Sequence, residues 1–64
     1  NIRTILEESL EHEKQGLVLY HQLLHHSAQK SVLVEEFARK MIQEEEMHVG
    51  EIYKMLMSPD TLKD

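Results

Sequence analysis

A carboxylate and an imidazole three residues apart are the clearest chemical feature of this sequence. Glu45 and His48 lie in a stretch with helical periodicity that runs from Val32 to Met57. Residues three apart on a helix lie on one face, so both side chains can reach one point in space, as ligands of a metal ion do. The chain has ten Glu and five His, so one such pair is unsurprising by itself. Its surroundings therefore decide whether it is a site.

Glu45 is the acid of the run Glu44-Glu45-Glu46 that the fold is expected to bury. Glu44 has Lys40 among its helical neighbours, and Glu46 has Arg39, so both can face water. The neighbours of Glu45 at three, four and seven residues, apart from His48, are all apolar: Ala38, Met41, Ile42, Val49 and Ile52. Buried acids are rare unless they are paired or bind a metal.

Glu13 is a second acid in an uncharged setting, in the first half of the chain. Its helical neighbours carry no charge: Leu6, Ser9, Leu10, Gly16, Leu17 and Tyr20. If the chain turns near Lys30, Glu13 and Glu45 lie about 25 and 22 Å from the bend, nearly level with each other. No Lys or Arg lies on either apolar stripe at that level. A divalent cation is the simplest way to hold the two acids together there.

Two long helices are expected to position these residues. The periodicity predicts helices over about 2–27 and 32–57, joined by a short connection, with Ser31 as N-cap of the second. Pro59 ends that helix, which leaves 58–64 as a C-terminal tail. A short connection between long helices predicts an all-α, antiparallel helical hairpin. A second stripe of Ile5, His12 and Leu19 suggests that the first helix is covered on more than one side, as in an assembly.

Length and composition narrow the function classes. A chain of 64 residues forms at most one small domain, whose core needs a metal or a partner for support. It has no Cys, which excludes disulfides and thiolate metal sites. The formal charge of −5 argues against nucleic acid as a partner, and no apolar run is long enough for a membrane span. A soluble, cytoplasmic protein is expected.

One hairpin supplies half of a known metal site. Di-iron and di-manganese carboxylate bundles take one Glu from each of two helices and a Glu-x-x-His pair from each of two others. This chain has Glu13 followed by Tyr20, then Glu45-Glu46-Met47-His48. In these residues it resembles the ferritin-like superfamily, most closely the second hairpin of a bacterioferritin-type subunit. Two copies related by a two-fold axis, or this piece and a matching half, would complete the four-helix bundle.

The resemblance implies roles for individual residues. Glu13 and Glu45 would be carboxylate ligands, with Glu45 bridging, His48 a terminal ligand, and Tyr20 a hydrogen-bond donor to a ligand carboxylate. The implied cofactor is a di-iron centre, with manganese as the other candidate metal, in at least a dimer of hairpins. Haem is not supported, because Glu46 replaces the Met that binds haem in bacterioferritins. The expected activity is that of a ferroxidase, which oxidises Fe(II) with O₂ or peroxide for iron storage or detoxification.

Other interpretations of the same residues remain open. A rubrerythrin-like peroxide-reducing di-iron protein would need a separate partner with a Cys-ligated iron centre. A metal-free helical dimerisation module would let its acids reach water or pair with basic groups of a partner. His21 and His25 are four apart and could bind metal, but near a helix end they are expected to be surface residues.

Overall fold

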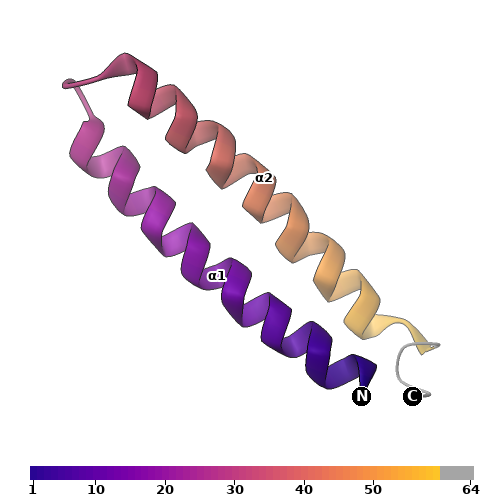
Figure 1. Cartoon of the computed structure of the whole chain (residues 1–64). Coiled ribbons are helices and arrows are strands. Elements are labelled where there is room, and N and C mark those ends of the chain that lie inside the picture. The colour runs from indigo at the N-terminus through magenta and orange to yellow at the C-terminus, as the bar shows by residue number, and fades with distance from the viewer. Residues whose placement is uncertain (60–64) are drawn as a thin grey trace.

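The computed structural model describes residues 1–59, which form two long helices packed side by side. Helix α1 spans Ile2–Ser27 and helix α2 spans Val32–Met57, and they run antiparallel (Figure 1). The predicted all-α helical hairpin is therefore confirmed. The helix bounds coincide with those expected from the periodicity, whereas most of the predicted tail, 58–64, lies outside the described residues.

Side chains cap the N-termini of both helices. The Asn1 side chain accepts a hydrogen bond from the Thr4 N–H at 2.8 Å, and the Ser31 hydroxyl accepts one from the Val34 N–H at 3.2 Å. The first N–H groups of a helix have no partner within it, so these caps satisfy them. At the other end of α2, Ser58 has an extended backbone, as expected for a residue before Pro59.

The connection between the helices is held by an interaction that the sequence pattern does not predict. Gln29 has a φ of 63°, in the left-handed region, and its N–H donates to Glu35 Oε1 at 2.8 Å. The other carboxylate oxygen of Glu35 lies 3.8 Å from an Arg39 nitrogen. Val34 occupies the position of the acid in a capping box, and Glu35, one residue later, reaches back to the turn instead.

The seam between the helices contains a very small core. Only Ala38, Ile42 and Ile52 are buried apolar residues among those described. The accessible surface is 5016 Å², against about 4300 Å² expected for a compact monomer of this mass. Neither described helix is long and apolar enough to cross a membrane. A hairpin this thin leaves much of its apolar surface in water.

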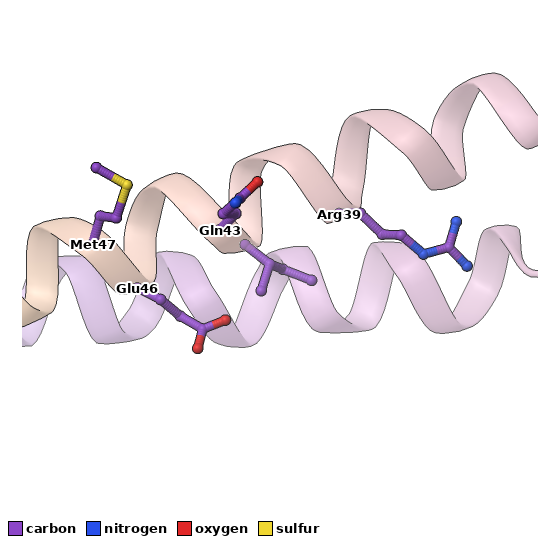
Figure 2. A pocket seen from close by; sticks show the side chains of 5 residues that line it. Arg39, Gln43, Glu46 and Met47 are labelled. Carbon is purple, nitrogen blue, oxygen red and sulfur yellow. The ribbon is translucent and has the colours of Figure 1, made fainter.

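Several contacts of charged side chains lie on one broad side of the hairpin. The Lys14 ammonium lies 5.4 Å from the centre of the Tyr53 ring, and its hydrogen bond with Tyr53 raises the pKa of Lys14 above its usual value. Arg39 also binds Glu36 at 3.0 Å. A shallow hollow lies along α2 there, lined by Arg39, Ile42, Gln43, Glu46 and Met47 (Figure 2). This side is called the outer face below.

We expect Ile42→Ala to lower the free energy of unfolding by about 2–4 kcal/mol, because Ile42 is one of the few side chains that fill the seam. Thermal and urea unfolding followed by circular dichroism at fixed protein concentration would measure the change. Val32→Ala is the matched control, since Val32 is largely exposed at the start of α2. Equal stability of the two variants would contradict the assigned core.

Candidate metal centre

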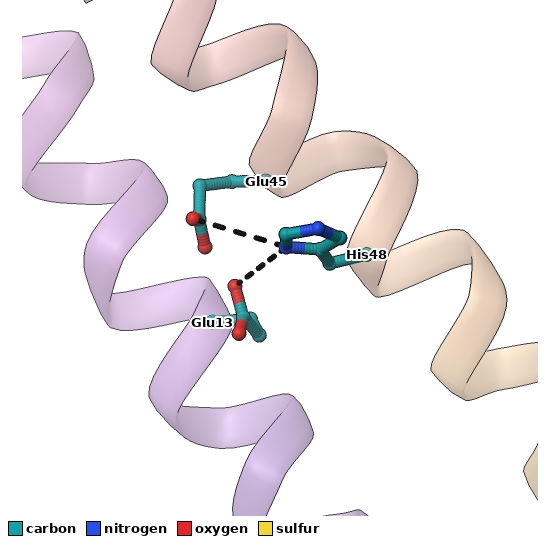
Figure 3. A group of neighbouring side chains, drawn as sticks. All are labelled: Glu13, Glu45 and His48. Atoms are coloured by element: carbon teal, nitrogen blue, oxygen red, sulfur yellow. Dashed lines mark ion pairs between the residues drawn. The ribbon is translucent and has the colours of Figure 1, made fainter.

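Three side chains from both helices converge near the middle of the hairpin. Glu13 comes from α1, and Glu45 and His48 come from successive turns of α2 (Figure 3). His48 Nδ1 lies 3.7 Å from Glu13 Oε2 and 4.0 Å from Glu45 Oε1. One donor atom from each residue lies within 4.8 Å of the other two. The predicted convergence of the three residues is therefore confirmed, while their role as ligands stays a prediction.

The two carboxylates are sheltered and the imidazole is open to one side. The side chains of Glu13 and Glu45 are 21 % and 15 % exposed, against 51 % for His48. Glu13 Oε2 is buried and, within residues 1–59, has no hydrogen-bond partner. An unpartnered buried carboxylate oxygen is costly, because it has lost water without gaining a donor. A cation bound next to this oxygen would compensate for the lost hydrogen bonds to water.

The spacing of the donor atoms suits a small cation with little movement. Ligand atoms about 2.1 Å from one ion lie roughly 3.0–3.4 Å from each other in tetrahedral or octahedral sites. The distances of 3.7 and 4.0 Å between His48 Nδ1 and the carboxylates are slightly longer. They also exceed normal hydrogen-bond lengths, so Nδ1 does not satisfy either acid by itself. Two carboxylates and one imidazole suit iron, manganese or zinc.

The site has room for further ligands on the side of His48. Three protein ligands leave a four- or six-coordinate ion with open positions. Figure 3 shows the second nitrogen of His48 on the edge of the ring farther from Glu13. In metal sites this nitrogen usually donates to an acceptor that fixes the ring. Within the described residues, His48 has ion-pair contacts only with Glu13 and Glu45.

Tyr20 makes a different contact from the one implied by the resemblance. Its ring packs edge-to-face against Phe37, with centroids 6.3 Å apart and planes at 73°. Among residues 1–59, no hydrogen bond joins its hydroxyl to Glu13 or Glu45. The hydrogen bond from Tyr20 to a ligand carboxylate thus stays a prediction for a completed bundle.

The remaining candidates lie away from the site. His21 and His25 are exposed, and the His25 ring packs against His26 with centroids 5.5 Å apart. Over residues 1–59, Glu13, Glu45 and His48 form the one cluster of three or more donors close enough for a shared ion. Glu44, which directly precedes Glu45, was expected to face water but is partly buried. Helical periodicity places Glu44 next to His48, one turn earlier on α2.

Comparison with models of known protein families, with curated proteins and with solved structures finds no significant match to this chain.

Gly16 and Gly50 differ in their relation to the site. A Cβ added at Gly16 would lie 3.6 Å from Glu45 Oε2, whereas one at Gly50 would meet nothing within 4 Å. Gly16 therefore leaves space beside a candidate ligand, and Gly50 lies over open space. Each glycine costs about 1 kcal/mol in a helix interior relative to alanine.

We expect Gly16→Ala and Gly50→Ala each to raise the free energy of unfolding by up to about 1 kcal/mol, because neither new methyl group clashes. Only Gly16→Ala narrows the space beside Glu45, so it alone should weaken binding of Mn²⁺. Chemical unfolding and calorimetric Mn²⁺ titration would measure both effects. The same Mn²⁺ affinity in the two variants would show that the space at Gly16 is not needed.

Proposed function

We propose that this chain is a ferritin-like protein that binds iron through Glu13, Glu45 and His48 and oxidises Fe(II) for storage or detoxification. The main support is Glu13 Oε2, which is buried and has no hydrogen-bond partner among residues 1–59. It lies 3.7 Å from His48 Nδ1, and a carboxylate oxygen of Glu45 is the third donor atom of the group. A cytoplasmic location and an assembly of at least two hairpins are part of this proposal. Iron is the substrate, with manganese as the competing metal.

Charge favours divalent cations in pairs. One hairpin brings two carboxylates, so two hairpins bring four, which balance the charge of two divalent ions. The imidazole of His48 adds a neutral donor on each side. Carboxylate and imidazole donors suit Fe(II) and become stronger partners of Fe(III), since its higher charge increases its attraction to oxygen anions. Oxidation is thereby favoured at this donor set.

The proposed reaction uses the open side of the site. Two Fe(II) ions held by the carboxylates each give one electron to dioxygen, which takes up two protons from water and leaves as hydrogen peroxide. With peroxide as oxidant, two electrons and two protons produce two water molecules. The part of this chain is to bind and orient the ions through Glu13, Glu45 and His48, and to keep basic side chains out of the seam.

We expect Glu45→Ala to abolish rapid Fe(II) oxidation, because it removes the more sheltered of the two carboxylates. Anaerobic Fe(II) loading followed by air, monitored by absorbance, should give about two irons oxidised per pair of hairpins in the unchanged protein. Glu46→Ala is the matched control, since Glu46 is the next acid along the chain but is exposed. Unchanged oxidation in Glu45→Ala would overturn the proposal.

Two further measurements separate the alternatives. A cation that binds only the folded protein raises its stability by about 2.7 kcal/mol at 100 times its dissociation constant. If excess Mn²⁺ or anaerobic Fe²⁺ leaves the melting temperature unchanged, the chain is a metal-free helical module. If loaded iron reacts with peroxide but not with O₂, the peroxide-reducing, rubrerythrin-like function is favoured.

A further inference from the structure

One broad face of the hairpin, opposite the outer face, carries large apolar side chains in water. Ile5 and Leu19 on α1 are each 64 % exposed, and Phe37 and Met55 on α2 are 51 % and 44 % exposed. His48 lies on α2 about three turns after Phe37 and about two turns before Met55. We call Ile5, Leu19, Phe37, His48 and Met55 the open face.

Helical geometry shows why these residues share one side of the hairpin. Leu19 comes one residue before Tyr20, and Phe37 one residue before Ala38, in the seam of their respective helices. One residue is a rotation of about 100° around a helix. In an antiparallel pair, the same sense of rotation turns the side chains of both helices toward the same broad face. His48 is thus exposed on the same broad side as the apolar residues of the open face.

The open face has matching residues at equal distances from the candidate metal centre. Ile5 and Leu19 each lie seven residues from His12, the neighbour of Glu13. Phe37 and Met55 each lie nine residues from Glu46, which is between Glu45 and His48. Both midpoints therefore lie at the level of the metal centre. This is the pattern of a self-complementary surface, as required at a two-fold interface.

We infer that a second copy of this chain docks on the open face, related by a two-fold axis that is perpendicular to the helices and passes at the level of His12 and Glu46. Each helix then lies against its own copy, running in the opposite direction. Ile5 faces the partner's Leu19, and Phe37 faces the partner's Met55. The inference rests on the proposed function for the completed metal site, and it identifies the second hairpin as an identical chain.

Charge selects this axis over one along the hairpin. The perpendicular axis places His48 opposite the partner's Glu44, since Glu44 and His48 each lie two residues from Glu46. A carboxylate is then available to the second nitrogen of His48, the usual arrangement for a metal-binding imidazole. An axis along the hairpin would instead place His48 near the partner's His12. There the imidazole would lie between the partner's His12 and the partner's Glu8, whereas the perpendicular axis gives it an acidic partner without a second imidazole beside it.

The size of the face is sufficient for a stable dimer. The Cα envelope measures 49 × 14 × 11 Å, so its broad face covers about 700 Å². Interfaces of standard size bury about 800 Å² on each partner. The seam alone buries too little for a stable small domain, so a second copy also supplies the missing core.

Crosslinking of single-cysteine variants tests the register, because the described chain contains no cysteine. We expect I5C chains mixed with L19C chains to join through a linker of about 10 Å, the usual separation of packed helices. I5C alone should not crosslink, since Ile5 and the partner's Ile5 lie about 21 Å apart along the axis. Crosslinking of I5C with M55C, or of I5C with itself, would overturn the inferred axis.

The use of the open face is tested by a pair of adjacent residues. We expect Leu19→Lys to raise the dimer dissociation constant more than about tenfold, because the symmetric interface would bury two unpaired ammonium groups. Val18→Lys is the control, since Val18 is 57 % exposed but points away from the open face. Analytical ultracentrifugation with EDTA and with Mn²⁺ would measure both.

The outcomes distinguish this inference from the proposed function. A monomer under both conditions, or equal dissociation of the Leu19→Lys and Val18→Lys variants, would overturn the inference whether or not iron is oxidised. A dimer with the Ile5–Leu19 crosslink that oxidises no iron would instead overturn the proposed function and leave the inferred interface in place.

Discussion

The close approach of two carboxylates in a seam without basic side chains is the main constraint on this hairpin. Glu13 and Glu45 project from different helices at one level, and the nearest group able to carry positive charge is His48. Repulsion between the acids opposes the packing that brings the helices together. The few buried apolar residues, Ala38, Ile42 and Ile52, hold the helices in place against it. The proposed metal binding would therefore be coupled to packing, because a cation between the acids would remove the repulsion that a small core has to overcome.

Stability and the proposed function would compete for the same short length of helix. The level of Glu13 and Glu45 lies in the middle of the hairpin, where apolar residues would contribute most to packing. Gly16 leaves space beside the Glu45 carboxylate at that level and contributes little of its own. A chain selected only for a stable hairpin would fill this position with a larger apolar side chain. The two acids and the glycine at that level instead suit the proposed ion-binding site.

Much of the fold and the convergence of the site residues could be predicted from the sequence, because both follow from helical period. Equal distances from the turn place Glu13 and Glu45 at one level, and the three-residue step adds His48. Ser31 was expected as N-cap from its type and position, and its side chain does cap α2. Helical periodicity does not determine whether these residues bind a metal. An acid among apolar neighbours is buried whether it is a metal ligand or has only a structural role.

The remaining features depend on contacts that period does not specify. Phe37 was expected in the apolar stripe of the second helix, yet it is half exposed, because a hairpin has one seam and two apolar sides cannot both enter it. Glu35 binds the Gln29 N–H six residues earlier, which depends on the left-handed turn at Gln29. The edge-to-face contact of Tyr20 with Phe37 likewise requires the relative rotation of the two helices.

The polar outer face has a consequence for how far an assembly of such hairpins can grow. There Lys14 contacts Tyr53, and Arg39 pairs with Glu35 and Glu36, so charged groups occupy the side turned away from His48. In the proposed pair, both copies would turn this side outward. A third hairpin on this side would then have to bury these hydrated charges. The cost of burying them disfavours a third layer, and with it the open-ended growth of a fibre.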